Sequence, residues 1–187
     1  MRKLFGTIIV GTALAALLTT GATTSAAPSP NHQQMPDLSG YAAVDPSPFR
    51  SPDYADNGRT FFVTPGGRTC ALGPGFGFNG CSGHPRTAPP GTVGVAISGG
   101  QDGPYWVPAD TGYRTTPRGW FRAPLLDIGQ SITVDGSTCA VRPDGVTCAA
   151  GPRAFTVTQT WFEFVYPAGD NRHDKNVDPQ FPPPAQG

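Results

Sequence analysis

Four cysteines are the residues of this 187-residue chain whose type and spacing most clearly indicate chemistry. They form two pairs, Cys70 with Cys81 and Cys139 with Cys148, with ten and eight residues between partners. Zinc-binding cysteine pairs are usually separated by two to four residues, and no two histidines stand at ligand spacing. The leader described below makes oxidation of an even cysteine count the default. We therefore predict two disulfides, no metal site and no cofactor.

The two cysteine pairs lie in a sequence motif that occurs twice in the chain, which we call the repeated phrase. Cys70 and its neighbours align with Cys139 and its neighbours, and further along the phrase Cys81 aligns with Cys148. Each copy predicts a strand, a Gly turn, a strand with one Cys, a second turn and a strand with the other Cys. Residues 143–145, Pro-Asp-Gly, suit a tight turn that would place Cys139 opposite Cys148. Four cysteines allow three connectivities, and the repeat favours the local pairs 70–81 and 139–148.

Signatures of catalysis are sparse. The chain lacks the G-x-S-x-G nucleophile elbow, so Ser98 and Ser131 are interpreted as strand-end residues. Paired cysteines leave no thiol as a nucleophile, and Glu163 is the only Glu available for a carboxylate pair. His84 has Gly151 at the matching place of the second copy, so we interpret it as a solvated loop residue. We predict no catalytic residue; the alternative is a secreted hydrolase whose active site the sequence does not reveal.

Aromatic side chains are the second lead, because flat rings stack on the apolar faces of sugars and peptides. The candidates for such a face are Tyr105, Trp106, Trp120, Phe121, Trp161 and Phe162. Only 37% of the chain is hydrophobic, so most of these rings are needed for the core. Trp106 and Trp120 stand beside Pro and Gly turns, and we predict that these two are exposed and bind ligand.

Residues 1–27 read as a signal peptide. Arg2 and Lys3 precede an apolar run from residue 4 to 18, and small residues follow up to Ala26 and Ala27. The run is shorter than the roughly 20 residues that span a bilayer, so we expect cleavage and a mature form without a membrane span. The expected location is the extracellular space or the cell wall.

Charge limits the classes of partner. Cleavage would leave 11 basic and 13 acidic side chains, a net charge of −2. A general nucleic-acid binder needs a basic patch, so we predict no nucleic-acid partner. Lys175 and Glu163 are the only Lys and Glu of the mature chain, and the loss of these helix formers favours strands and turns.

Composition divides the mature chain into three parts. Residues 28–58 are rich in Pro, Ser and Asp, and predict an extended arm or linker. Tyr41 and Phe49 in this arm leave open that it docks as an edge strand or strap. Residues 59–166 contain all four cysteines and form the predicted domain, and residues 167–187 predict a Pro-rich flexible tail.

Strand patterns dominate residues 59–166. Residues 92–98, TVGVAIS, alternate as a half-buried strand, and residues 104–108 are bounded by prolines as an edge strand is. Residues 154–166 switch their apolar face partway, which predicts a break near Gln159. We predict a monomeric all-β domain: a small antiparallel sheet or sandwich with two duplicated, disulfide-pinned hairpins.

The phrases FFVTPGGRTCAL and LLDIGQSITVDGSTCAVRPDGVTCAAGPRAFTVTQTWFEF resemble those of a group of small, exported, uncharacterised proteins of mycobacteria and related actinobacteria. The resemblance covers residues 59–166, and Ala154 stands where that group often has Gly. The shared motifs describe a scaffold, so the resemblance implies an exported disulfide-containing domain and transfers no catalytic residue. With the lack of catalytic signatures, it favours a non-enzymatic module of the cell envelope or extracellular space that binds another macromolecule or a glycan.

Overall fold

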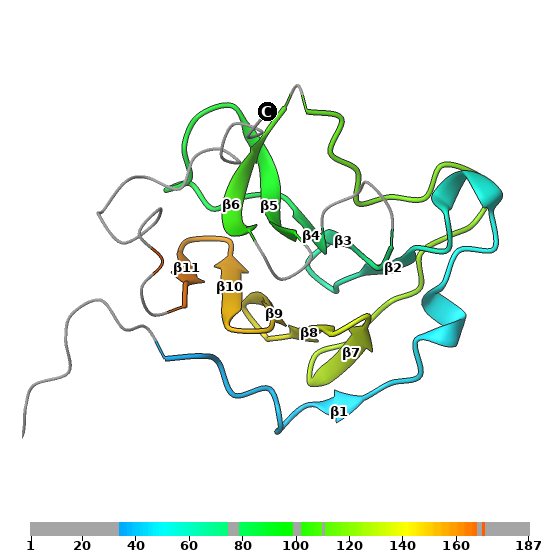
Figure 1. The fold of residues 1–187 in the computed structure, drawn as a ribbon, viewed down its shortest axis with the longest axis horizontal. Coiled ribbons are helices and arrows are strands. Elements are labelled where there is room, and N and C mark those ends of the chain that lie inside the picture. The colour runs from blue at the N-terminus through cyan, green and yellow to red at the C-terminus, as the bar shows by residue number, and fades with distance from the viewer. Residues whose placement is uncertain (1–33, 75–78, 99–101, 110, 168–169, 171–187) are drawn as a thin grey trace, which may run out of the picture.

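Strands account for nearly all regular structure in the computed structural model, which describes residues 34–74, 79–98, 102–109, 111–167 and 170. Two sheets stack face to face (Figure 1). The six-stranded sheet has the order β1-β7-β8-β9-β10-β11, with the bounds β1 Ala42–Ala43, β7 Gln130–Val134, β8 Ser137–Val141, β9 Gly145–Ala150, β10 Arg153–Thr158 and β11 Phe162–Val165. The five-stranded sheet follows chain order, with β2 Thr60–Val63, β3 Thr69–Leu72, β4 Asn79–Ser82, β5 Thr92–Ser98 and β6 Asp102–Pro108. The predicted all-β class is confirmed.

The repeated phrase forms corresponding strands of the two sheets. The first copy is β2-β3-β4 and the second is β7-β8-β9, each an antiparallel run. Cys70 pairs with Cys81 across β3 and β4, Cys139 pairs with Cys148 across β8 and β9, and the Cα atoms are 4.0 Å apart in both disulfides. The predicted local connectivity is therefore confirmed.

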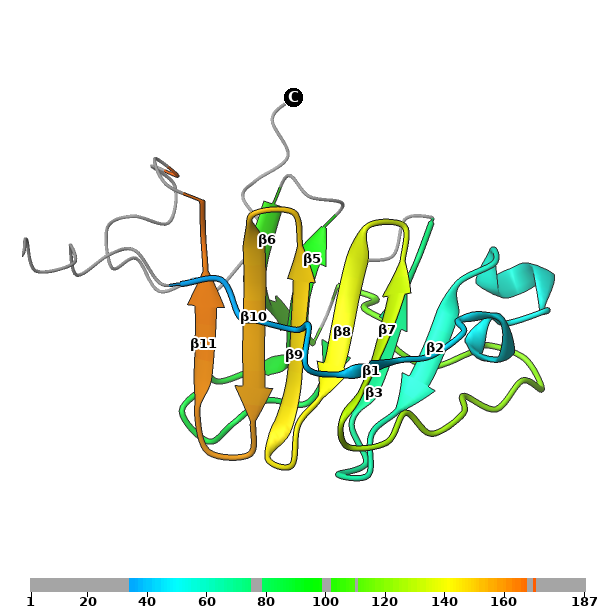
Figure 2. The ribbon, with the colours of Figure 1, turned by 90° about the horizontal axis from the view of Figure 1, so that it is seen from below.

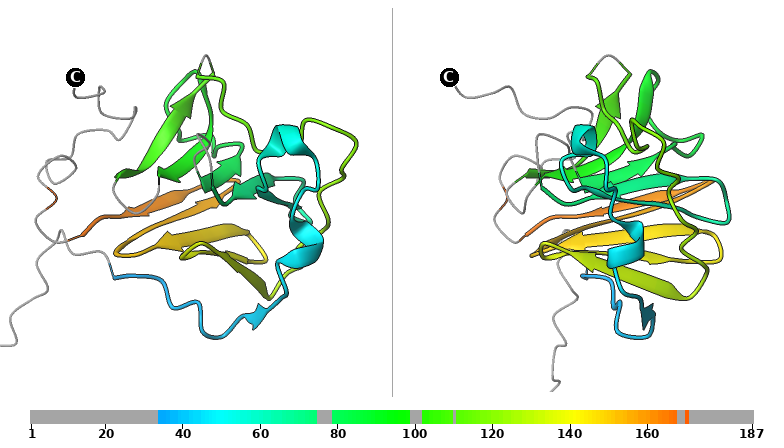
Figure 3. Two further views of the ribbon diagram at one scale, coloured as in Figure 1. Left: turned by 45° about the vertical axis from the view of Figure 1, so that its right-hand side comes forward. Right: turned by 90° about the vertical axis from the view of Figure 1, so that its right-hand side faces the viewer.

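The duplication extends beyond the phrase that the sequence repeats. After β4 come β5 and β6, and after β9 come β10 and β11, each joined to the strand before it by antiparallel pairing. Each half of the domain is thus a five-stranded meander, and the two meanders pack face to face (Figure 3). Two equivalent halves can bury the apolar face that neither could bury alone.

The core between the sheets contains both disulfides and a cluster of rings. Trp106 lies 4.9 Å from Phe162 and 5.2 Å from Phe164, measured between ring centroids. Its exposed fraction is 0%, so the prediction that Trp106 is exposed is wrong. The prediction that residues 104–108 form an edge strand is confirmed, because β6 ends its sheet. An edge strand still buries its inner face when a second sheet covers it, and here β10 and β11 do so.

The predicted break near Gln159 is a chain reversal. β10 ends at Thr158 and β11 begins at Phe162, and the two strands pair antiparallel in the same sheet. The Thr158 amide donates to the carbonyl of Trp161 across the turn (3.0 Å). The apolar face therefore switches because the chain turns back.

Residues 34–46 cross the outer side of the six-stranded sheet as a strap, from β11 to β7 (Figures 1 and 2). Ala42 and Ala43 in the strap pair in parallel with β7, and the amide of Val44 donates to the carbonyl of Ser131 (2.9 Å). The outer face beneath consists largely of small buried side chains, among them Ala140 and Ala154 at 0% exposure. Small side chains let another segment approach closely, so this half of the predicted arm is a strap.

The connection between β6 and β7 covers the outer face of the five-stranded sheet. Tyr113 lies against Gly80 and Gly94, where any Cβ would collide with its ring or hydroxyl, and its hydroxyl donates to the carbonyl of Val95 (2.8 Å). Ala96 is therefore fully buried. The prediction that residues 92–98 are only half-buried is wrong, because glycines on the second face accommodate a covering aromatic ring.

Residues 1–27, the predicted signal peptide, and 171–187 of the predicted tail lie outside the described residues. Asp170 is described, and its carboxylate forms an ion pair with Arg153 (2.7 Å). Packing therefore extends a few residues past the predicted domain end at 166. No helix among the described residues is long and apolar enough to cross a membrane.

Candidate functional site

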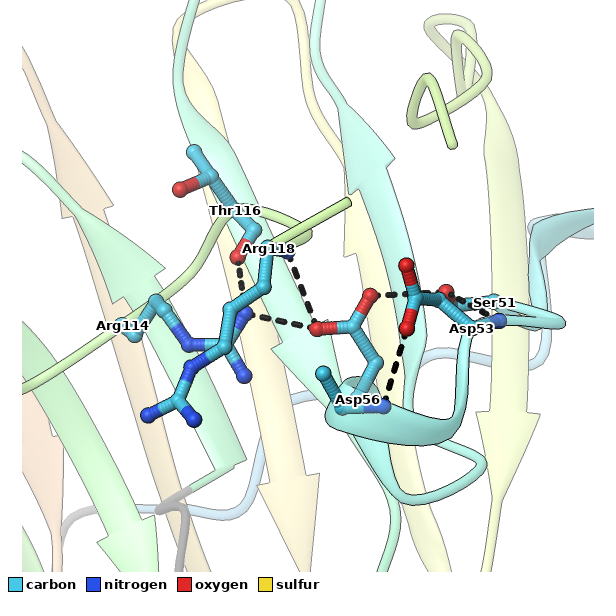
Figure 4. Close-up of polar contacts among 7 residues, drawn as sticks. Ser51, Asp53, Asp56, Arg114, Thr116 and Arg118 are labelled. Atoms are coloured by element: carbon cyan, nitrogen blue, oxygen red, sulfur yellow. Dashed lines mark hydrogen bonds and ion pairs between the residues drawn. The ribbon is translucent and has the colours of Figure 1, made fainter. Parts of the chain in front are cut away.

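The segment that follows the strap and the β6–β7 connection meet at a buried carboxylate (Figure 4). Asp56 follows the strap, and its side chain has an exposed fraction of 0%. It accepts hydrogen bonds from the Ser51 hydroxyl (2.7 Å), from Nη1 of Arg114 (2.7 Å) and from the amide of Arg118 (3.0 Å). We call Ser51, Asp56, Arg114 and Arg118 the clasp, because it joins the segment after the strap to the β6–β7 connection.

Local sequence sets the position of the clasp. Asp53 caps the short helix η2 (Tyr54–Asp56) by accepting from the amide of Ala55 (2.9 Å), and Asn57 ends it with φ 51°. Asx capping and left-handed Asn are usual at such turns. The guanidinium of Arg114 lies 5.7 Å from the ring centroid of Phe61, a buried residue of β2. The clasp thus rests on the five-stranded sheet.

The clasp favours the ionised form of Asp56. Burial opposes ionisation, yet the hydrogen bonds from Ser51, Arg114 and Arg118 outweigh it, so the pKa of Asp56 lies below its ordinary value. A buried carboxylate with three donors has little capacity left for a proton or a substrate. The role of Asp56 is therefore structural: its carboxylate holds two segments together.

We expect the clasp to make the domain acid-sensitive. A carboxylate with a lowered folded-state pKa stabilises the fold above the ordinary aspartate pKa of about 3.9, and this contribution is lost as pH falls through the folded-state pKa. The free energy of unfolding, measured by urea melts from pH 6 to pH 2.5, should fall more steeply in the wild type than in Asp56→Asn. The exposed variant Asp144→Asn should change this slope less. Equal slopes for wild type and Asp56→Asn would contradict the assignment.

Two aromatic rings project from the segments that the clasp joins. Tyr54 in η2 is 99% exposed and Trp120 in the β6–β7 connection is 72% exposed. Their neighbours touch, because the carboxylate of Asp53 lies directly against Gly119, where any Cβ would collide with it. We call Tyr54 and Trp120 the aromatic knuckle. Flat rings present apolar faces to a ligand, so Tyr54 and Trp120 are the candidates for a ligand-binding surface.

The structure separates the predicted site residues. Trp120 is exposed as expected, whereas Trp106 is core and cannot contact a ligand without unfolding. Cys70, Cys81, Cys139 and Cys148 are all in disulfides inside the core. The exposed His84 has a ring nitrogen 3.2 Å from the carbonyl of Pro85. Within the described ranges, no three His, Cys, Asp or Glu side chains gather as a metal site would require.

Sequence reasoning missed the clasp and Tyr54. Asp56 and Arg114 are 58 residues apart and lie in loops without apolar periodicity. A signal for Tyr54 was present, since an aromatic residue amid Ser, Pro and Asp has few neighbours to bury it. No protein-family model, curated protein or solved structure matches this chain.

Proposed function

We propose that the protein is an exported, non-enzymatic binding module of the cell envelope or extracellular space, and that it binds a glycan on another macromolecule. The observation that carries the proposal is the aromatic knuckle. Tyr54 and Trp120 are the two most exposed large rings among the described residues. Flat rings present apolar faces to the C–H faces of sugars, and their hydroxyl and indole N–H groups bond to sugar oxygens.

The clasp supports a binding role for the knuckle. A rigid backbone lowers the entropy that is lost when a surface orders around its ligand. Asp53 and Asp56 fix η2, and the Arg118 amide fixes the chain just before Gly119 and Trp120. Both rings are therefore attached to backbone that is ordered before a ligand arrives.

Two observations support export. Two disulfides are typical of chains that mature in an oxidising compartment. Residues 1–27 have the pattern of a signal peptide. The resemblance of residues 59–166 to small exported actinobacterial proteins points the same way, and we propose that the mature chain acts as a monomer outside the cytoplasm.

A glycan array probed with the mature chain tests the proposal. We expect binding to a subset of glycans, and at least tenfold weaker binding by Trp120→Ala and by Tyr54→Ala, since a lost ring contact of about 1.4 kcal/mol corresponds to tenfold. Both rings are largely exposed, so the melting temperatures should stay near that of the wild type.

Val93→Ala is the matched control, because Val93 is an exposed apolar residue on β5, outside the knuckle. It should bind as the wild type does. An array without binding, or knuckle variants with wild-type affinity, would contradict the proposal. Turnover of hydrolase probes by the same preparation would favour the alternative, a secreted hydrolase.

A further inference from the structure

A small polar pocket lies at the end of the sandwich where three turns meet. The turn between β2 and β3, the turn between β8 and β9 and the turn after β10 lie at the same end, the lower one in Figure 2. The pocket encloses about 80 Å³. Its lining includes Thr64, Arg68, Ile128, Arg142, Asp144 and Gln159. We call it the turn-end pocket; it shares no lining residue with the clasp or the knuckle.

Arg68 gives the turn-end pocket its charge. Nη1 of Arg68 donates to the carbonyl of Ser82 (2.6 Å), and Nη2 donates to the carbonyl of Thr158 (3.1 Å). Both acceptors are neutral, and no carboxylate of the described residues forms an ion pair with Arg68. Burial lowers the pKa of Arg68, which reflects the cost of removing its charge from water. An anion in the pocket would offset that cost.

The other charged groups of the lining cancel. Nε of Arg142 lies 2.9 Å from Oδ1 of Asp144, an ion pair across the β8–β9 turn. The lining therefore carries a net charge of about +1, located on Arg68. A guanidinium has five N–H donors in a planar fork, which matches the two oxygens of a carboxylate.

The size of the turn-end pocket limits what enters it. Sites that enclose a whole small molecule are usually about 300–1,000 Å³. A pocket of about 80 Å³ has room for one small group such as a carboxylate. The remainder of the ligand must then lie on the rim.

The rim presents apolar surface beside the pocket. Trp161 is 39% exposed and Ile128 is 48% exposed. The guanidinium of Arg142 lies 5.7 Å from the ring centroid of Trp161, which fixes that ring next to the pocket lining. Thr158 links the two features, because its carbonyl accepts from Arg68 and its amide donates to the carbonyl of Trp161.

We propose that the turn-end pocket binds the carboxylate of an acidic sugar, with the carboxylate on Arg68 and the sugar ring against Trp161. The proposal takes its ligand class from the proposed glycan-binding function, but it uses neither ring of the knuckle. It adds a second subsite, selective for a uronic-acid type of residue, at the opposite end of β2 from the clasp.

Titration of the mature protein with glucuronate, glucose, acetate and inorganic phosphate, followed by ¹H–¹⁵N NMR, tests the inference. We expect glucuronate to shift both the indole N–H of Trp161 and the Nε–H of Arg68. Glucose should bind at least tenfold more weakly because it lacks the carboxylate. Acetate and phosphate should also bind at least tenfold more weakly because they lack the ring. Equal affinity for glucose, or for either simple anion, would overturn the inference.

Two variants separate charge from ring contact. Arg68→Gln should abolish glucuronate binding, and Arg122→Gln removes the same charge at an exposed site outside the pocket and should bind as the wild type does. Because Arg68 also joins β4 to β10, Trp161→Ala provides a readout that leaves that link intact, with at least fivefold weaker binding expected. Wild-type affinity in Trp161→Ala would refute the proposed pose. Wild-type glycan binding by Tyr54→Ala and Trp120→Ala together with intact glucuronate binding would reject the knuckle proposal and retain this one.

Discussion

Replacement of Asp56 by Ala is expected to lower the free energy of unfolding by roughly 3 kcal/mol, near the lower end of the range for breaking a buried ion pair. The variant removes the acceptor shared by Ser51, Arg114 and Arg118, and leaves the Arg114 guanidinium without its ion-pair partner. The side chain of Arg114 is 23% exposed, so water relieves part of the cost. Urea melts of both proteins at pH 7 measure the difference.

The same substitution should loosen both covering segments at once. The clasp joins the segment that continues from the strap to the β6–β7 connection. Its loss should therefore speed hydrogen exchange at the amide of Val44, which donates to Ser131, and at the amide of Leu126 in the connection, which donates to Val63. Asp45→Ala is the control, because Asp45 is an exposed carboxylate that accepts from the Ser47 amide. A loss of unfolding free energy and of exchange protection no larger in Asp56→Ala than in Asp45→Ala would contradict a joining role for the clasp.

The disulfides and the six strands of the repeated phrase were predictable because they depend on local patterns. Turn residues and cysteines recur in the same order, and each cysteine pair closes within its own hairpin. The remaining part of the duplication was not predictable. β5 begins at Thr92 and β10 at Arg153, so these equivalent strands lie closer together along the chain than Cys70 and Cys139 do. Loops of different length shift the alignment of the two halves. A strand also needs only a pattern of apolar side chains and no particular residues, so equivalent strands can lack a recognisable sequence repeat.

Exposure of single rings depended on contacts between distant segments. Trp106 and Trp120 both stand near turn residues, yet Trp106 packs on Phe162 and Phe164, which lie far along the chain from it. Trp120 belongs to the β6–β7 connection and stays 72% exposed. Neighbours in sequence show that a turn is near, but only the opposite sheet decides which side of a strand is buried.

The clasp shows a second limit of sequence reasoning. An Asp and an Arg in separate loops have no period and no motif, and the chain contains many of both. Their pairing depends on where the segment after the strap meets the β6–β7 connection, and only the packed sheets fix that position. Gly80 and Gly94 are a visible trace of one part of this arrangement, the close approach of the β6–β7 connection to β4 and β5, since glycines inside paired strands often mark a close approach.

Removal of either disulfide is expected to cost about 2–5 kcal/mol of unfolding free energy. In the double variants Cys139→Ala/Cys148→Ala and Cys70→Ala/Cys81→Ala the targeted pair leaves no free thiol to reshuffle. The loops that they close are short, with sequence separations of 9 and 11, and loop entropy alone gives roughly 2.5–3 kcal/mol. All four cysteines are at most 2% exposed in the shared core, so each loss also removes buried contacts.

The two double variants should lose similar amounts, because the disulfides occupy equivalent strands of the two meanders and face one core. Thermal melts of the wild type and both double variants under oxidising conditions measure this. The control is the wild type melted with reductant. Its melting temperature should fall at least as far as that of the less destabilised double variant if the disulfides stabilise the native fold. A loss below about 1 kcal/mol in either variant, less than the loop-entropy contribution alone, would show that its hairpin holds through strand pairing. A large loss in only one would show that a single meander forms the folding core and the other adds to it.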